Sequence, residues 1–406
     1  MDSPHLPNVS DHLRSRAQAI GFSLLGITPA VRPETLEYFR DWIHAGLHGT
    51  MEYLPRRERA YEHPAGVQMG VKTILMAALN YGPGENDGPR ENDVPGEDVG
   101  DRVGRIAAYA QGTADYHDVM RHKLSELADA LHQQMPQART RIAVDTAPLL
   151  ERDAAQRAGL GWFGKNTMLI NKWTGSYFFL GAILTDVELP YDAPHQTDHC
   201  GTCTRCLDAC PTQAFQGPHV LDASRCISYL TIELREQPVP LDLRTGMGNW
   251  LFGCDLCQQV CPWNRKSSPT AIPELRPRPD QLPQAEAILN MSPDEFRDQY
   301  KQTPFARPGH SGMARNAAIV LGNSHDERSV PTLAKALDDH SPPFVRGAVA
   351  WALGEIATAS AQAVLQRRLL EEPDAQVQAE IAAALQRISP GSTSQSPLRD
   401  GDLPGE

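Results

Sequence analysis

The stretch CGTCTRCLDACPTQAF (200–215) brings four cysteines together and places a proline directly after the last of them. Its spacing, C-x2-C-x2-C-x3-C-P, is that of the bacterial ferredoxin run, in which the fourth cysteine ligates the other of two iron–sulfur clusters. The run therefore predicts a second cysteine segment elsewhere in the chain. It also predicts tight turns around the clusters, because each cluster needs four thiolates.

The second segment is CDLCQQVCP (254–262), and RCISYL (225–230) contributes one more cysteine. If the last cysteine of each run crosses over, the eight thiols divide evenly between two 4Fe-4S clusters. One cluster would be held by Cys200, Cys203, Cys206 and Cys261, and the other by Cys210, Cys226, Cys254 and Cys257. A pair of zinc knuckles is the alternative, because C-x2-C is also a zinc spacing. Clusters alone predict electron transfer and name no substrate.

The composition is that of an ordinary soluble protein with room for two or three domains: 406 residues, 41% hydrophobic and 22% charged. No run of 18 apolar residues is present, and the first residues contain no hydrophobic signal segment, so we expect a cytoplasmic protein without a membrane contact. All eight cysteines lie between residues 200 and 261. This clustering favours metal binding in a reducing compartment over a disulfide framework.

The formal net charge of −12 argues against a broad nucleic-acid-binding surface. About half of that charge comes from the Gly/Pro-rich segment 85–101, which holds seven acidic residues against Arg90 alone. We expect this segment to be a mobile loop. The rest of the surface is therefore much less acidic than the net charge suggests.

The sequence divides into four regions. Alternating helix and strand patterns predict a mixed α/β (α+β) domain over 1–187, followed by a ferredoxin-like domain over 188–268. After a Pro-rich connector, Leu321, Leu353 and Leu385 recur at intervals of 32 residues, which predicts an all-α domain of HEAT-like repeats over 269–390. The polar end, 391–406, is expected to be a disordered tail.

The stretch RTRIAVDTAPLLERDAAQRAG (139–159) predicts a short strand that ends near Asp145, and then a helix. Thr146 is the expected N-cap of that helix, and Gly159 its stop. This places Asp145 at the carboxyl end of a strand, where α/β domains expose side chains to a ligand crevice. An aspartate that begins a helix as a cap is the simpler interpretation.

Several stretches together resemble the epoxyqueuosine reductase family over nearly the whole chain. They include HGTMEYL (48–54), ADYHDV (114–119), VDTAPLLERDAAQRAGLGWFGKN (144–166) and MGNWLFGCDLCQQVCPWNR (247–265). The resemblance implies an oxidoreductase that binds cobalamin in its N-terminal domain and feeds it electrons from two 4Fe-4S clusters. The implied substrate is tRNA that carries epoxyqueuosine in its anticodon, with reduction to queuosine at the wobble position. A monomer and an external donor of the flavodoxin or ferredoxin type are expected.

The resemblance also assigns site residues. Asp145 matches the proton donor, and it would need desolvation to hold a proton at neutral pH. The positions implied to contact cobalamin are Arg59, Ala108, Tyr109, Asp145, Leu169, Leu180, Ser228, Thr231, Asp255 and Leu256. The spacing around Arg59 departs from the family pattern, which leaves Arg56, Arg57 and Tyr61 as alternatives. The expected tRNA contacts are Arg307, Arg315 and, one repeat later, Arg346, with structural arginines of the repeats as the alternative.

Two other functions compete with this interpretation. A cobalamin-dependent reductive dehalogenase shares the cofactors, but it predicts an export signal with paired arginines and no helical repeats. An iron–sulfur electron-transfer scaffold would carry both clusters, bind no corrin and have no need of Asp145.

Overall fold

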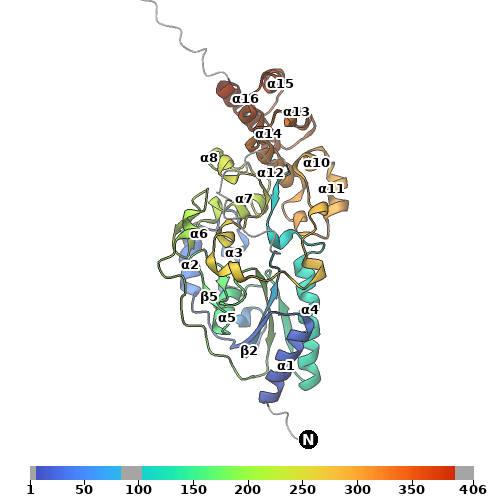
Figure 1. Ribbon diagram of the computed structural model, residues 1–406. Coiled ribbons are helices and arrows are strands. Elements are labelled where there is room, and N and C mark those ends of the chain that lie inside the picture. The colour runs from blue at the N-terminus through green and yellow to red at the C-terminus, as the bar shows by residue number, and fades with distance from the viewer. Residues whose placement is uncertain (1–5, 84–102, 389–406) are drawn as a thin grey trace, which may run out of the picture.

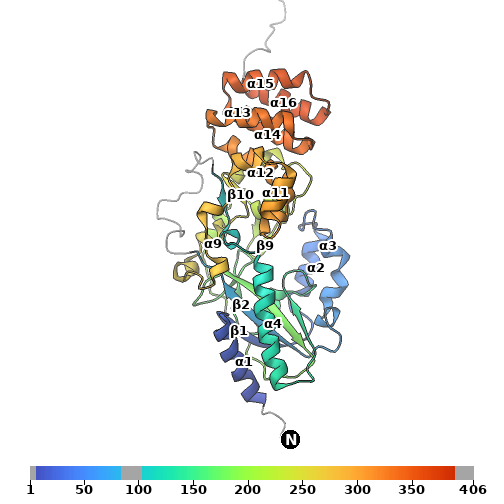
Figure 2. The same cartoon turned by 90° about the vertical axis from the view of Figure 1, so that its right-hand side faces the viewer.

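The computed structural model describes residues 6–83 and 103–388, and its elements follow one another along a long axis (Figure 1). A sheet part (6–83 and 103–187) lies at the N-terminal end and a cluster part (188–268) in the middle. In the repeat part (269–388), the first residues pack against the sheet part, and the helices from Ala285 on lie at the other end (Figure 2). The acidic segment 85–101 and the expected disordered tail 391–406 lie outside the described residues. The predicted mixed helix and strand content is confirmed, with a helical end.

A four-stranded sheet forms the centre of the sheet part. Its strands lie in the order β1-β2-β7-β4, and every neighbouring pair is antiparallel. Their bounds are Leu24–Pro29 for β1, Thr73–Asn80 for β2, Phe178–Thr185 for β7 and Thr140–Ala143 for β4. The central strands β2 and β7 are buried along almost their whole length, which explains why their sequences are nearly continuous apolar runs.

Helices cover both faces of this sheet. On one face, α1 (Leu6–Ile20) and α4 (Tyr116–Gln134) share an apolar cluster with β2 and β7. On the other face lies α5 (Glu151–Arg157). Two shorter helices, α2 (Leu36–His44) and α3 (Tyr53–Arg56), come between β1 and β2 in the chain.

Two sequence-based expectations about this region are corrected. Helix α5 begins at Glu151 with Leu150 as its N-cap, so Thr146 lies in the preceding loop and caps nothing. Gly159, with φ of 77°, does follow the end of the helix, as expected. Because the sheet is antiparallel, the α+β form of the predicted fold is the one that holds. The crevice rule of parallel α/β sheets therefore does not explain the exposure of Asp145.

The cluster part consists of short elements around the cysteines. They are α6 (Arg205–Asp208), β8 (Phe215–Gly217), β9 (Val220–Leu221), α7 (Ile227–Ile232), α8 (Leu241–Arg244), β10 (Trp250–Phe252) and α9 (Leu256–Gln259). Strand β10 pairs in parallel with β3 (Arg105–Ile106) of the sheet part, with Trp250 opposite Arg105. A second small pair, β5 (Trp162–Phe163) and β6 (Leu169–Ile170), lies within the sheet part. The β3–β10 pairing joins the first two parts of the chain.

The repeat part is a stack of helices: α10 (Ala285–Asn290), α11 (Pro293–Tyr300), α12 (Gly309–Asn323), α13 (Val330–Asp339), α14 (Pro343–Ile356), α15 (Ala359–Leu369) and α16 (Ala375–Ile388). Helices α12, α14 and α16 pack closely in succession. A Cβ atom added to Gly322 would lie 2.8 Å from Ala352, and one added to Gly354 would lie 2.7 Å from Ala384. Small residues 32 positions apart therefore allow the close stacking that the repeat period predicts.

The cluster and repeat parts share one hydrophobic core. A single apolar cluster runs from Ile106 and Phe252 through α7 into α12, α14 and α16. The core crosses both predicted domain boundaries, at 187/188 and at 268/269. These boundaries remain predictions.

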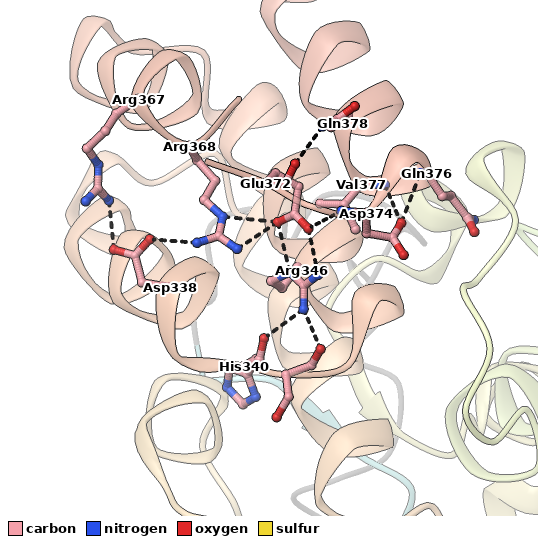
Figure 3. A network of polar contacts seen from close by, with 11 residues as sticks. Asp338, His340, Arg346, Arg367, Arg368, Glu372, Asp374, Gln376, Val377 and Gln378 are labelled. Carbon is pink, nitrogen blue, oxygen red and sulfur yellow. Dashed lines mark hydrogen bonds and ion pairs between the residues drawn. The ribbon is translucent and has the colours of Figure 1, made fainter. Parts of the chain in front are cut away.

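Two of the three predicted tRNA-contacting arginines are structural. Arg315 is fully buried in α12, and its Nη2 and Nη1 atoms donate to the carbonyls of Leu230 and Gln237 at 2.6 and 2.8 Å. Arg346 is buried in α14 and forms an ion pair with Glu372, with Nη2 2.6 Å from Oε1 (Figure 3). The prediction that these two side chains contact tRNA phosphates is wrong, because their donors are buried and engaged inside the protein.

Glu372 gathers several donors in the loop before α16. It accepts from Arg346, from Arg368 and from the amide of Asp374 (Figure 3). Burial alone would raise the pKa of Glu372, but hydrogen bonds from Arg346 and Arg368 lower it to about 2. The stabilisation is therefore present above the ordinary glutamate pKa of about 4.3 and is lost as the pH falls toward 2.

Replacing Glu372 by alanine should lower the free energy of unfolding by about 3–5 kcal/mol, because Arg346 is left as an uncompensated buried charge. Urea denaturation followed by circular dichroism measures the change. The exposed neighbour Glu371 is the matched control, and Glu371→Ala should change stability by less than about 0.5 kcal/mol. Equal effects of the two substitutions would contradict this account of the repeat part.

Candidate active site

The segment between β4 and α5 turns sharply at Asp145. The Thr146 amide donates to the Val144 carbonyl at 2.5 Å, which closes a three-residue γ-turn centred on Asp145. Asp145 has φ of 58°, in the left-handed region that non-glycine residues adopt at a cost. The turn leaves the Asp145 side chain 46% exposed.

Three donors from outside this loop converge on one oxygen of Asp145. The Tyr116 hydroxyl and His117 Nε2 both lie 3.3 Å from Oδ2, and Arg307 Nη2 lies 3.4 Å from it. Tyr116 and His117 open α4, whereas Arg307 precedes α12. Arg307 also pairs with Glu233, which follows α7, at 3.4 Å. The carboxylate thus lies where all three parts of the chain meet.

Asp115 fixes the orientation of the His117 ring. As the N-cap of α4, it accepts from the His117 amide at 2.9 Å, and its Oδ1 lies 2.7 Å from His117 Nδ1. The other ring nitrogen, Nε2, therefore faces Asp145. Next to it, the Tyr116 ring stacks on Phe179 with a centroid distance of 4.1 Å. The result is a carboxylate–imidazole–carboxylate chain with a packed aromatic wall.

The proton of this group resides on His117. Burial alone would lower the pKa of His117, but its hydrogen bonds to Asp115 and Asp145 raise it to about 9. The hydrogen bond from His117 lowers the pKa of Asp145 to about 2, with the charge of Arg307 also contributing and burial opposing. A desolvated Asp145 that holds its own proton was expected. In this structure the neighbouring cations keep Asp145 ionised and leave the proton on the imidazolium.

The eight free thiols divide into two electrostatic groups. Burial raises the pKa of Cys206 to about 11, and the thiols that add to this effect are Cys261, Cys200 and Cys203. Burial also raises the pKa of Cys257, where the added effects come from Asp255 and from the thiols Cys226, Cys206 and Cys210. Burial also raises the pKa of the partly exposed Cys254, and Cys226 and Cys257 raise it further. The division agrees with the predicted crossover, and the effect of Cys206 on the pKa of Cys257 indicates that the two groups lie near each other.

This grouping rests on electrostatics and not on coordination distances. Within residues 6–83 and 103–388, no three His, Cys, Asp or Glu side chains are arranged to hold a single metal ion. The fit to two clusters therefore comes from the donor set itself, since eight thiols in two ferredoxin-type runs supply four thiolates to each cluster.

The turn at residues 164–167 holds the loops of both cysteine groups. Lys165 Nζ donates to the carbonyls of Gly201 and Cys203 at 2.7 and 2.9 Å. The side-chain amide of the next residue, Asn166, donates to the Cys257 carbonyl at 3.2 Å. The sheet part thus contacts both loops through two adjacent side chains and keeps them in a fixed relation.

The positions predicted to contact cobalamin lie on both sides of the junction between the sheet and cluster parts. The Ala108 amide donates to Asp255 Oδ2 at 2.5 Å, and Thr231 Oγ1 accepts from the Gly253 amide at 2.9 Å. Tyr109 packs against three aromatic rings, with centroid distances of 5.9–6.4 Å, namely Tyr116, Phe179 and Phe252. Burial raises the pKa of Asp255 to about 6. This junction brings together side chains that are far apart in the sequence.

The exposure of these positions suits a large, mostly apolar ligand. Tyr109, Leu180, Ser228 and Leu256 are partly exposed, whereas the remaining junction positions are buried: Ala108, Leu169, Thr231 and Asp255. Leu169 and Leu180 pack in the apolar cluster that also contains Ala143 and Leu149, on either side of the Asp145 turn. Partly exposed apolar side chains beside a few polar groups fit a corrin, and these residues would hold it.

Arg59 and the three alternatives to it as a cobalamin contact differ in their surroundings. Arg59 and Arg56 are exposed, and Tyr61 is buried against Phe39. Arg57 donates from Nη1 to the Thr146 carbonyl at 3.2 Å, so it contacts the Asp145 turn directly. The assignment of Arg59 to the cofactor stays a prediction.

The residues of this site that were not selected from the sequence include Tyr116, His117, Glu151 and Glu233. The signal for the first two was present in ADYHDV, where Asp115 is a helix cap and a tyrosine and a histidine follow it. Glu151 lies in the first turn of α5, and its Oε1 accepts from the Asp145 amide at 2.8 Å. Burial, with the charge of Asp145, raises the pKa of Glu151 to about 8. No motif in the sequence around Glu233 indicates that it belongs to this site.

Comparisons with known proteins agree with these features. Family models match residues 62–146 as epoxyqueuosine reductase QueG, residues 199–264 as a 4Fe-4S double cluster binding domain, and residues 309–386 as HEAT repeats. The chain is 39% identical over 356 residues to an epoxyqueuosine reductase of Xanthomonas campestris, covering 87% of this chain and 97% of that protein. It is 37% identical to one of Pseudomonas aeruginosa, with 87% and 96% covered.

Solved structures give the same result. An epoxyqueuosine reductase with an epoxyqueuosine-modified tRNA stem loop matches with a TM-score of 0.85 and 31% identity, over 95% of this chain and 100% of that one. The Bacillus subtilis enzyme, with its catalytic aspartate loop swung out of the active site, matches with a TM-score of 0.84 and 31% identity, over 94% and 100%. The double-cluster match favours iron–sulfur clusters over zinc knuckles.

Replacing Asp145 by asparagine should lower the pKa of His117 from about 9 toward its ordinary value of about 6.5. The fall should be partial, because Asp115 still accepts from the ring. NMR titration of the histidine ring nitrogens, assigned with His117→Gln, measures it. Asp118→Asn, at an exposed carboxylate that pairs with Arg121, is the control and should leave the pKa unchanged. A wild-type His117 pKa in Asp145→Asn would contradict the ion pair.

Substitution of Cys261 by serine should impair the cluster of the first cysteine run. The thiol of Cys261 belongs to the same electrostatic group as Cys200, Cys203 and Cys206. Cys210→Ser should impair the other cluster. Iron analysis and EPR of the reduced variants measure this: each variant should lose one signal, and the lost signals should differ. If Cys261→Ser and Cys257→Ser lose the same signal, the crossover is wrong.

Proposed function

The chain belongs to the epoxyqueuosine reductase family, and on that basis we propose that it reduces the epoxide of epoxyqueuosine in tRNA to the alkene of queuosine. The observation that carries the proposal is the Asp145 carboxylate, which lies beside a charged imidazole at the junction of the sheet, cluster and repeat parts. The similarity to an enzyme solved with an epoxyqueuosine-modified tRNA stem loop supports tRNA as the substrate.

The reaction requires electrons and protons from different sources. Conversion of an epoxide to an alkene and water consumes two electrons and two protons. Bound cobalamin would supply the electron pair at its cobalt, after electrons have passed singly through the 4Fe-4S clusters. One proton must come from an acid within hydrogen-bond distance of the departing oxygen. The second, which completes the water molecule, is taken from solvent.

Asp145 and His117 form a path for the proton that reaches the departing oxygen first. The His117 side chain is 13% exposed, whereas that of Asp145 is 46% exposed, so Asp145 is the member of the chain that faces the substrate. The three donors to Asp145 all lie at Oδ2, which leaves Oδ1 for the substrate oxygen. A proton passes from His117 Nε2 to Asp145 and then to the departing oxygen. Asp115 stabilises the charged imidazole before the transfer.

The contact of Arg307 with tRNA stays a prediction, and the ion pairs of this side chain support a further role beside Asp145. Its side chain is 35% exposed, and it already pairs with Asp145 and Glu233. We propose that it orients the carboxylate and stabilises its charged form between turnovers. Since the loop of the Bacillus subtilis relative swings out, the Asp145 turn is expected to open for the modified base and to close over it.

The remaining expectations concern partners and surroundings. A donor of the flavodoxin or ferredoxin type would deliver electrons to the clusters, and the chain would act as a monomer in the cytoplasm. Among the helices of the described ranges, none is both long enough and apolar enough to cross a bilayer.

Anaerobic purification and assay test this proposal. The protein should bind added cobalamin, as seen in its optical spectrum, and convert epoxyqueuosine to queuosine in tRNA when a chemical reductant is supplied. Failure to bind the corrin would favour the electron-transfer scaffold instead. Cobalamin binding without conversion of the tRNA would contradict the assigned substrate.

Asp145→Asn should lower turnover about 10²–10⁴-fold, because the amide cannot relay the proton of His117. Cluster content and cobalamin binding should stay at wild-type levels, and nucleoside mass spectrometry of the tRNA measures turnover. Asp118→Asn, an exposed neighbour on α4, is the control and should retain full activity. Near-normal turnover of Asp145→Asn would show that the acid lies elsewhere.

A further inference from the structure

The Asp145 turn has little packing of its own. Val144 and Leu149 are buried and anchor its two ends, whereas Asp145 and Thr146 between them are exposed. The left-handed φ of Asp145 is unfavourable for a residue with a side chain. Since burial does not hold the middle of the turn, hydrogen bonds must hold it.

The hydrogen bonds to the Asp145 carboxylate do not hold the backbone of the turn. Tyr116, His117 and Arg307 contact the distal oxygen of a side chain that rotates about two bonds. They orient the carboxylate once the backbone is in place. The backbone angle that directs the side chain toward them is restricted by the hydrogen bond from Thr146 to Val144 within the turn and by side chains that bond to the backbone of the turn.

Two side chains make such contacts. Glu151 accepts from the Asp145 amide at 2.8 Å, and Arg57 donates to the Thr146 carbonyl at 3.2 Å. Glu151 is the closer of the two and comes from the first turn of α5, where an acidic side chain is favourable. Arg57, by contrast, is an exposed side chain at the end of α3.

We propose that Glu151 is a positioning residue, which holds the Asp145 turn inward by accepting the Asp145 amide on its carboxyl oxygen. This inference deepens the proposed function and depends on it for its catalytic meaning. Without the acceptor, the turn relaxes from its left-handed conformation, and the Asp145 carboxylate leaves the donors that orient it. The turn is held by the oxygen of Glu151 that accepts from the Asp145 amide, and the charge of Glu151 is not required.

Glutamine separates the acceptor from the charge. Glu151→Gln keeps a carbonyl oxygen at the same reach and is close in shape to a protonated glutamate, whereas Glu151→Ala removes the acceptor. Alanine suits a first helical turn, so α5 should still form. Glu126→Ala is the control, because Glu126 lies farther along α4 and contacts only His122 among the ion pairs of the described residues.

Hydrogen exchange of the holoenzyme, followed by mass spectrometry of the peptide covering 144–150, is the test. In Glu151→Ala this peptide should exchange at least about tenfold faster, and kcat on epoxyqueuosine tRNA should fall about tenfold to a hundredfold with KM within threefold of wild type. Glu151→Gln and Glu126→Ala should stay within about threefold of wild type in both measurements.

Two results would overturn the inference. Wild-type exchange of the 144–150 peptide in Glu151→Ala would show that the acceptor does not hold the turn. Equal loss in Glu151→Gln and Glu151→Ala would assign the effect to charge. If the wild-type protein does not convert epoxyqueuosine tRNA, the proposed function fails, and the exchange rates still decide whether Glu151 holds the turn.

Discussion

The ion pairing of Asp145 with His117 and Arg307 is the interaction on which the rest of the site depends. It forms only if the β4–α5 turn, the start of α4 and the segment before α12 meet at one point. A strained turn exposes the carboxylate, and the cations around it keep it charged and aligned. The protein thereby stores the proton on His117, one hydrogen bond away from the more exposed Asp145 carboxylate.

The repeat part contributes to this arrangement from inside the protein. Arg315 and the next residue, Asn316, reach from α12 to the carbonyls of α7 and β10, including Leu230 at 2.6 Å and Thr231 at 2.8 Å. Helix α7 directly follows Cys226, one of the predicted cluster ligands. The helical repeats therefore support the cluster part as well as Arg307, and their buried arginines serve packing and not tRNA contact. This explains how one core comes to span regions that look separate in the sequence.

Local patterns predicted much of this protein. The cysteine spacing, the 32-residue period and the strand that ends before Asp145 are all short-range features, and the structure or the comparisons bear them out. The missed features are long-range. Arg307 lies 162 residues from Asp145, and it links Asp145 to Glu233. The burial of two arginines was also not predicted. Arg315 and Arg346 read as surface cations in the sequence, whereas in the structure carbonyls and a carboxylate surround them.

The most direct test is the nucleoside content of tRNA from a bacterium that lacks its own epoxyqueuosine reductase and expresses this chain. We expect mass spectrometry to find queuosine in place of epoxyqueuosine when cobalamin is supplied, and epoxyqueuosine alone when the chain is absent. If epoxyqueuosine persists in cells that contain the folded protein with both clusters and cobalamin bound, the assigned reaction is wrong.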